Sequence, residues 1–253
     1  MIINVYKPRG WTSNDVVQKI KHSCGFKKVG HAGTLDPLAE GVLLVLTDTD
    51  TKGQSELMAL KKEYLVKIAF GYESDSHDLG TPIKPAGKLI AEELTHDAMQ
   101  NALGKYLGKI QQQVPAYSAV HVDGQRLYNF AREITANRQR KQAVDYKTAR
   151  GDPLISLPLP YKEVEIFDIT ICSFINNEQL NYPEVKDEQI SCTIAELRVS
   201  CGKGTYIRSL VRDLGNDLGC GAVAVSLIRT KVGGYSIEDS LTLEKVFLEH
   251  LKS

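Results

Sequence analysis

The most informative stretch of the chain is GHAGTLDPLAEG at residues 30–41, followed directly by the apolar run Val42–Leu46. Three glycines and one proline in these twelve residues predict a loop, because glycine permits positive φ and proline fixes its own φ. Asp36 precedes Pro37, which biases its backbone toward an extended conformation and projects its carboxylate from a constrained turn. The residues alone predict a rigid Asp-bearing loop beside a buried strand. They leave both catalysis and an ordinary Asp-Pro turn open.

Helical periodicity of apolar residues appears on both sides of this loop. The clearest helices are expected over Ser13–Cys24, with Ser13 or Asn14 as the cap, and over Thr205–Leu218, stopping at Gly219. Weaker helical patterns cover Leu94–Leu107 and Leu243–Leu251.

Strand-like runs complete the pattern. They are Val42–Leu46, Tyr64–Phe70, Val164–Phe174 and Thr193–Ser200, and the last two alternate irregularly enough to contain a bulge. The strands and helices follow no regular βαβ rhythm. We therefore predict an α+β fold, with a mixed, mainly antiparallel central sheet flanked by helices.

The composition is that of an ordinary globular protein. The chain has 253 residues, 31 basic against 31 acidic residues, and 42% hydrophobic residues, which excludes fibrous, disordered and membrane classes. The beginning of the sequence does not have the pattern of a signal peptide. The five cysteines are odd in number and widely spaced, which argues against a disulfide framework and a zinc site and predicts reduced thiols in the cytoplasm.

Charge is unevenly distributed along this neutral chain. Residues 125–150 contain seven basic and two acidic residues, whereas residues 176–196 contain five acidic residues and one lysine. The basic stretch is either a solvated loop or a surface that contacts phosphates, and the local pattern does not separate the two interpretations.

The loop at residues 30–41 resembles the signature of the TruB family of tRNA pseudouridine synthases. Further segments resemble other motifs of that family in the family's order: Lys7–Ser13, Thr51-Lys52, Lys62–Tyr64, Gly71–Gly80, Pro115–Val120, Gly124–Arg132, Gly204–Leu210 and Gly219–Arg229. The glycine that usually follows the family's Ala-Arg pair is replaced by Glu133.

The resemblance implies a pseudouridine synthase fold and an isomerase. Such an enzyme breaks the N1–C1′ bond of a uridine, turns the flipped-out base and joins C5 to C1′. Asp36 is then the essential carboxylate, acting either on C1′ as a nucleophile or on C2′ as a base. Arg208 is expected to pair with Asp36, and Tyr64 to contact the base. The resemblance implies neither a metal nor an organic cofactor.

The same resemblance assigns the substrate and its contacts. The expected substrate is the T-loop uridine of tRNA at conventional position 55, within the T-arm. His31, Tyr206 and Leu227 are expected to line the nucleotide pocket. Apart from the resemblance, our candidates for phosphate contacts are the basic residues Lys7, Lys52, Arg126 and Lys203 and the basic stretch from Arg126 to Arg150.

Residues 1–253 are expected to form a single catalytic domain, with an internal extension around residues 133–195 and no C-terminal RNA-binding domain. We expect a cytoplasmic monomer with no membrane attachment and no obligate protein partner. Two alternatives stay open: a guide-RNA-dependent enzyme acting on ribosomal RNA, and an RNA-binding or folding protein that has lost catalysis. The intact Asp36, Tyr64 and Arg208 argue against the second.

Overall fold

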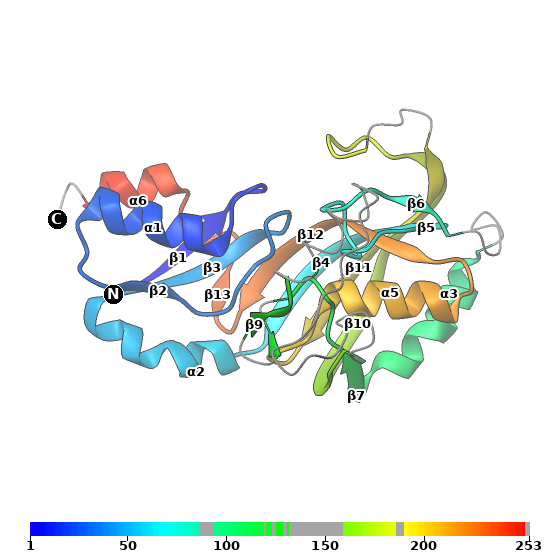
Figure 1. Cartoon of the computed structure of the whole chain (residues 1–253), viewed down its shortest axis with the longest axis horizontal. Helices are drawn as coiled ribbons and strands as arrows, with labels where there is room; N and C mark the ends of the chain where they lie inside the picture. The colour runs from blue at the N-terminus through cyan, green and yellow to red at the C-terminus, as the bar shows by residue number, and fades with distance from the viewer. Residues whose placement is uncertain are drawn as a thin grey trace.

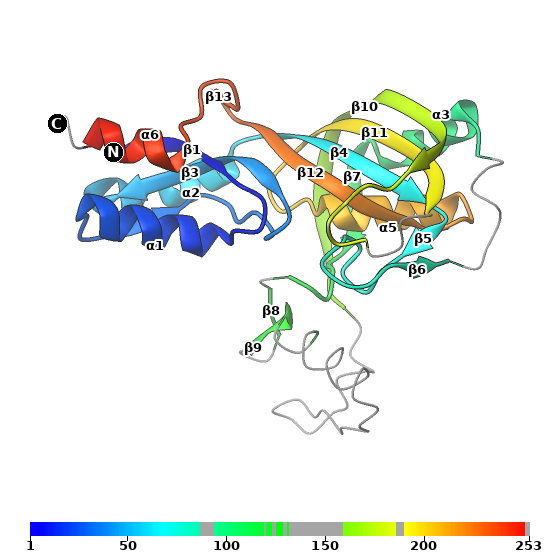
Figure 2. The same cartoon turned by 90° about the horizontal axis from the view of Figure 1, so that it is seen from above.

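A curved β-sheet forms the centre of the computed structural model (Figures 1 and 2). The structure describes residues 1–86, 94–118, 120–122, 125–128, 131, 159–185 and 190–250. Within these residues nine strands pair in the order β1-β3-β12-β4-β11-β10-β7, with β2 beside β3 and β13 beside β12. The strands are β1 (Ile2–Lys7), β2 (Val29–His31), β3 (Glu40–Thr47), β4 (Lys62–Phe70), β7 (Gly108–Gln113), β10 (Tyr161–Gln179), β11 (Ser191–Cys201), β12 (Ala222–Val232) and β13 (Tyr235–Ser236).

The sheet is mixed but mainly antiparallel, which confirms the predicted fold class. The one parallel pairing among the described strands joins β12 to β3 at Ile228–Glu40 and Arg229–Gly41. Two short hairpins lie off the main sheet: β5 (Tyr72–Glu73) with β6 (Lys84–Pro85), and β8 (His121–Val122) with β9 (Gln125–Arg126). The β8–β9 hairpin projects away from the body (Figure 2).

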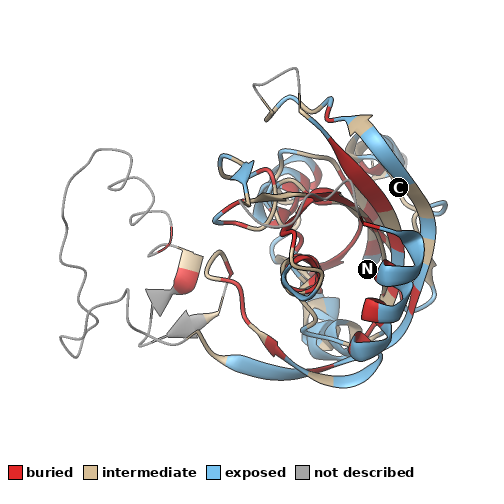
Figure 3. Ribbon diagram, turned by 90° about the vertical axis from the view of Figure 1, so that its right-hand side faces the viewer, coloured by how far each residue is buried: buried red, intermediate tan, exposed pale blue. Residues whose placement is uncertain are grey.

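Helices flank the sheet as expected. They are α1 (Ser13–Cys24), α2 (Gln54–Ala59), α3 (His96–Leu103), α5 (Ile207–Asp217) and α6 (Leu243–His250), with short 3-10 helices η1 (Asp48–Gly53) and η3 (Gly104–Tyr106). Buried residues gather on α5 and on the inner side of the curved sheet, while exposed residues predominate on its outer side (Figure 3). No helix among the described residues is long and apolar enough to cross a membrane.

Helix α1 begins as a capping box. Its cap is Thr12, whose hydroxyl accepts from the Asp15 amide while the Asp15 carboxylate accepts from the Thr12 amide. The predicted cap at Ser13 or Asn14 is therefore wrong. The Ser13 hydroxyl is turned inward instead and bonds the backbone at Leu35. The helix ends as predicted, at Cys24, before Gly25 in the left-handed conformation.

Helix α5 supplies one side of the largest core. Its apolar stripe of Ile207, Leu210, Val211 and Leu214 packs with buried residues of β4 and β11. Burial of each such side chain stabilises the fold by roughly 1.5–3 kcal/mol. This core fixes the first turn of α5, where Arg208 lies, against the sheet.

Strands β10 and β11 contain the expected irregularities. Their pairing shifts register between Ile166 and Asp168, between Ile171 and Ser173, and between Ile175 and Glu178. Bulges of this kind bend a strand and increase its twist. Residues 132–158, which include most of the predicted basic stretch and much of the predicted internal extension, lie outside the described residues.

Gly215 lies where α5 packs closely on the start of β12. A Cβ atom at Gly215 would lie 2.5 Å from the carbonyl carbon of Gly221, and the Gly215 carbonyl accepts hydrogen bonds from the amides of Cys220 and Gly221. We expect Gly215→Ala to lower the free energy of unfolding by about 1–3 kcal/mol, because backbone would have to move. Gly104→Ala is the matched control, since a Cβ there meets nothing within 4 Å. Equal urea midpoints for the two variants would contradict this account.

Candidate active site

The loop that carries Asp36 is clamped by the segment between β1 and α1. The Ser13 hydroxyl accepts from the Leu35 amide at 2.8 Å and donates to the Leu35 carbonyl at 3.1 Å. The Gly10 amide donates to the Pro37 carbonyl at 2.8 Å. The residues on both sides of Asp36 are thus held by the backbone and side chains of a neighbouring segment. This observation gives the predicted rigidity of the loop its physical basis.

Lys7 belongs to the same clamp. It is fully buried, and its ammonium donates to the carbonyls of Pro8 at 2.9 Å, Trp11 at 2.6 Å and Pro37 at 3.2 Å. Burial lowers the pKa of this ammonium to about 8. Lys7 was predicted to contact a phosphate, and the structure contradicts that prediction, because all three donors of the ammonium are directed at carbonyl oxygens inside the protein.

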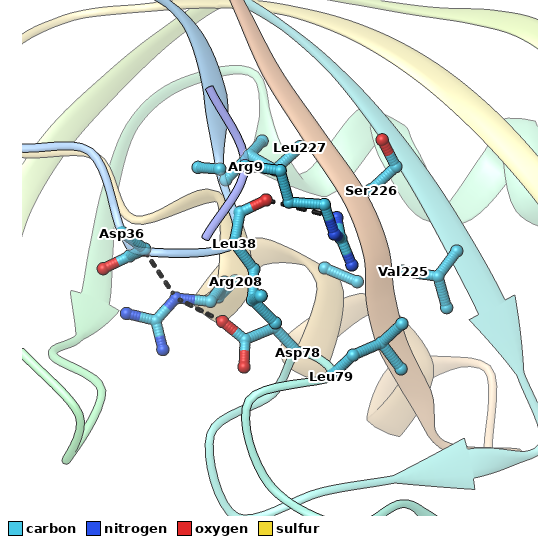
Figure 4. Close-up of a pocket in the computed structure, with 11 residues that line it drawn as sticks. Arg9, Asp36, Leu38, Asp78, Leu79, Arg208, Val225, Ser226 and Leu227 are labelled. Carbon is cyan, nitrogen blue, oxygen red and sulfur yellow. Dashed lines mark hydrogen bonds and ion pairs between the residues drawn. The ribbon is translucent and has the colours of Figure 1, made fainter. Parts of the chain in front are cut away.

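Arg208, in the first turn of α5, reaches Asp36 as predicted. Its Nε donates to Oδ2 of Asp36 at 2.8 Å (Figure 4). Its two terminal nitrogens donate to the carbonyls of Ser76 at 2.7 Å and Tyr117 at 2.8 Å. The side chain of Arg208 is 5% exposed, whereas that of Asp36 is 35% exposed. The arginine is therefore an internal anchor, and the carboxylate that it holds still faces open space.

A second carboxylate, Asp78, lies 3.6 Å from Nε of Arg208. Its Oδ1 accepts from the Ser76 hydroxyl and from the Gly80 amide at 2.9 Å. Burial raises the pKa of Asp78, and the Arg208 charge opposes that rise. For Arg208, burial alone would lower the pKa, but the charges of Asp36 and Asp78 raise it overall. The guanidinium thus stays charged between two acids.

The sequence motifs do not indicate a role for Asp78. It lies in the quoted segment Gly71–Gly80, but Asp75 is in the same segment and is exposed. The local pattern does not indicate which of the two carboxylates turns inward. The choice depends on the turn at residues 74–78, where the Ser74 hydroxyl donates to the Asp78 carbonyl at 2.6 Å.

Tyr64 enters the site from β4, opposite Arg229 of β12 in the strand register. Arg229 is 1% exposed, and its guanidinium donates to the carbonyls of Val42 at 2.7 Å and Gly33 at 3.1 Å. It therefore ties both ends of the Asp36 loop to the sheet. Burial raises the pKa of the Tyr64 hydroxyl, which keeps the phenol protonated at neutral pH. Arg229 was not predicted as a site residue, because a lone arginine in a strand carries no local signal.

An open cleft of about 510 Å³ connects these groups. Its walls include six of the predicted site residues, which are Asp36, Tyr64, Lys203, Tyr206, Arg208 and Leu227. Its volume falls within the range of about 300–1,000 Å³ that is usual for small-ligand sites. Tyr206 is fixed in the wall because its backbone amide and carbonyl both bond the side chain of Gln112, at 2.8 and 3.0 Å.

Of these residues, Lys203 is exposed on the cleft wall. The other predicted residues are dispersed. Lys52 is exposed on η1 and is not among the residues that line the cleft. His31 lies in β2, also outside the cleft lining, and burial lowers its pKa. For Arg126 the structure describes the backbone, in β9. The described residues contain no cluster of three or more potential metal ligands.

Comparison with known proteins adds to this geometry. Residues 21–150 match the family model "TruB family pseudouridylate synthase (N terminal domain)", and residues 208–251 match "tRNA pseudouridylate synthase B C-terminal domain". The chain belongs to the TruB family. The tRNA pseudouridine synthase B of Acaryochloris marina is 36% identical over 96% of this chain and 71% of that relative. The protein of the same name from Phocaeicola vulgatus is 37% identical over 94% of this chain and 88% of that relative.

The fold is shared with solved structures. A chain of a Cbf5-Nop10-Gar1 complex superimposes with a TM-score of 0.64 and 24% identity, over 97% of this chain and 53% of that chain. A structure described as an H/ACA RNP bound to a substrate RNA containing 2′-deoxyuridine gives a TM-score of 0.59 and 23% identity, over 97% of this chain and 52% of that chain. The resemblance inferred from the motifs, and with it the expected fold and the class of isomerase, is confirmed.

The titration of His77 makes the stability of the fold depend on pH. It has φ 61° beside Asp78, and burial, with the nearby charges of Arg212 and Arg208, lowers its pKa to about 4. An unfolded chain has a histidine pKa near 6.5, so it binds more protons than the folded chain between pH 6.5 and 4, and stability falls as the pH falls through that window.

His77→Asn removes this titration while keeping a residue type that tolerates positive φ. From pH 7 to pH 5 we expect the variant to lose about 2 kcal/mol less unfolding free energy than the wild type. Urea unfolding at the two pH values measures the difference. If the unfolding free energies of the wild type and the variant fell equally from pH 7 to pH 5, His77 would not be held in its neutral form by the fold.

Proposed function

We propose that this chain converts uridine to pseudouridine in the T-loop of tRNA, at conventional position 55, with Asp36 as the essential carboxylate. The observation that carries the proposal is the Asp36–Arg208 pair, a partly exposed carboxylate on a buried guanidinium at the wall of a cleft. Membership of the TruB family and the names of the relatives support the reaction and the tRNA substrate.

Asp36 has the properties that the reaction requires. Breaking the N1–C1′ bond makes the sugar carbon electron-poor, and a carboxylate can trap that carbon or remove the neighbouring C2′ proton. Either step needs an ionised oxygen directed at the sugar. Arg208 donates to Oδ2, while Oδ1 of Asp36 accepts no hydrogen bond from the described residues. The arginine thus orients the group and leaves one oxygen available to the substrate.

The aromatic residues of the cleft suit a base that has left its stack. An extruded base is commonly held between aromatic and apolar side chains, and Tyr64, Tyr206 and Leu227 all line this cleft. Because the Tyr64 phenol is protonated at neutral pH, it can donate a hydrogen bond to a base carbonyl. After C5 has bonded to C1′, the C5 proton must move to N1, which kept the electron pair of the broken N1–C1′ bond. The Tyr64 hydroxyl is our candidate to assist that proton transfer.

Basic side chains are our candidates for contacts with the phosphate backbone of the RNA. Lys203 is exposed on the wall, and we extend the assignment to Lys52 and Arg126. Phosphate contacts of this kind increase affinity in a salt-dependent way without reading base sequence. With zero formal net charge, the chain depends on such local contacts more than on long-range attraction.

Transfer RNA is favoured over a guide-RNA complex. The relatives at 36–37% identity are named tRNA pseudouridine synthase B, whereas the chain of the Cbf5-Nop10-Gar1 complex is 24% identical and supports the fold alone. We accordingly propose that the chain acts as a cytoplasmic monomer on the T-arm, that it forms a single catalytic domain, and that it needs no cofactor.

A synthetic T-arm hairpin with unmodified uridines tests the proposal. We expect pseudouridine at the T-loop uridine, and for Asp36→Asn a loss of at least about 1,000-fold in the single-turnover rate, because the amide cannot act as a nucleophile or base. Affinity for the hairpin should change less than about threefold. Asp97→Asn, at a carboxylate that is 97% exposed on α3, is the matched control.

The alternatives give different results in this assay. Tight binding without product by the wild-type chain would favour an RNA-binding protein that has lost catalysis. Wild-type rates in Asp36→Asn would disprove the role of Asp36.

A further inference from the structure

Arg9 connects an acidic turn outside the cleft to the Asp36 loop. The turn comprises Tyr182–Val185, between β10 and β11, and is closed by a hydrogen bond from the Val185 amide to the Tyr182 carbonyl at 2.9 Å. It belongs to the acidic segment at residues 176–196, to which the proposed function gives no role. Arg9, from the segment between β1 and α1, extends to this turn.

Arg9 is held on three sides. Its Nε and Nη2 donate to the two carboxylate oxygens of Glu184, at 3.2 and 3.0 Å, in the paired geometry that makes arginine–carboxylate contacts specific. Its guanidinium carbon lies 5.8 Å from the centre of the Tyr182 ring. The side chains of Arg9 and Glu184 are each 24% exposed, so water screens this pair less than it screens a surface pair.

The remaining nitrogen of Arg9 points back to the Asp36 loop. Nη1 donates to the Leu38 carbonyl at 3.2 Å, two residues after Asp36 (Figure 4). Ser13 already holds Leu35, and Gly10 and Lys7 hold Pro37. Arg9 therefore adds the outermost contact of the clamp, and among the described contacts it is the one whose orientation depends on the turn between β10 and β11.

We propose that Glu184 and Arg9 are positioning residues for the reaction: Glu184 orients the Arg9 guanidinium, and Arg9 fixes the Asp36 loop through the Leu38 carbonyl. The inference rests on the proposed role of Asp36. Burial alone would raise the pKa of Glu184, but its hydrogen bonds, including those from Arg9, lower it overall, so the carboxylate is ionised near neutral pH. Glu184, within the acidic segment, thereby acquires a role that requires no contact with RNA.

A positioning role and a purely stabilising role differ in what they change. If the pair only joins two parts of the fold, its loss lowers stability and leaves the reaction rate of the folded protein unchanged. If it positions Asp36, its loss slows the chemical step, since a displacement of about 1 Å in a catalytic group can cost about 100-fold in rate. Substrate affinity should change little in that case, because neither residue needs to touch the RNA.

Glu184→Ala is the first test. We expect the single-turnover rate on the T-arm hairpin to fall about 10- to 100-fold, with less than a twofold rise in the dissociation constant. Glu73→Ala is the control, because it removes the carboxylate of an exposed pair with Lys84 on the β5–β6 hairpin. An unchanged rate would overturn the proposal. If binding were weaker at that unchanged rate, Glu184 would instead contact the RNA directly.

Amide hydrogen exchange in the free protein gives a readout without substrate. The Ala39 amide donates to the Asp36 carbonyl and the Gly10 amide to Pro37, so both report on the loop. We expect exchange at these amides to accelerate at least threefold in Glu184→Ala but not in Glu73→Ala. Equal protection would overturn the positioning role. This measurement answers the question even if Asp36→Asn keeps full activity, so failure of the inference and failure of the proposed function can be told apart.

The charge-swapped double variant Arg9→Glu with Glu184→Arg isolates the contact with Leu38. The swap can restore an ion pair, but glutamate cannot donate to the Leu38 carbonyl. We expect the swap to recover thermal stability relative to Arg9→Glu alone while its single-turnover rate stays at least 10-fold below that of the wild type. Recovery of the wild-type rate would overturn the proposed route through Leu38.

Discussion

The buried guanidinium of Arg208 is the constraint on which the site depends. A charge removed from water is tolerated only with partners of good geometry, and loss of one partner commonly costs several kcal/mol. Arg208 finds its partners in three separate segments: Asp36, the Ser76 carbonyl and the Tyr117 carbonyl. These segments must converge on the first turn of α5 for the fold to form. The position of the Asp36 carboxylate thus follows from the need of the buried Arg208 cation for partners.

The rest of the fold holds the two sides of this interaction in place. The apolar stripe of α5 packs on the sheet and fixes the arginine, while the segment between β1 and α1 grips the loop that carries the aspartate. Arg229 connects that loop to β12, next to Tyr64 in the strand register. The Lys7 and Arg229 side chains that support the loop donate to backbone carbonyls. The loop can therefore be rigid without further charged side chains competing for Asp36.

Much of this arrangement could be predicted from the sequence where the pattern is local. Apolar periodicity predicts helices α1, α3, α5 and α6 and strands β3, β4, β10 and β11, and the motifs single out the pair Asp36 and Arg208. It misses strands β1, β7 and β12; β12 contains register shifts at Ala224/Ser226 and Arg229/Lys231, which break the alternation on which strand prediction depends. Lys7 was misassigned because nothing local distinguishes a buried ammonium from an exposed one. The inward turn of Asp78 likewise depends on contacts distant in sequence.

We propose that the shape of the Arg208 guanidinium, and not merely its charge, places Asp36 for reaction. Arg208→Lys keeps the charge but cannot bond three segments in a fixed plane. The decisive measurement is its single-turnover rate on the T-arm hairpin at saturating protein, with the dissociation constant measured in parallel. We expect a loss of at least about 100-fold in rate, with affinity within about threefold of the wild type. A folded Arg208→Lys protein that reacts at the wild-type rate would contradict it.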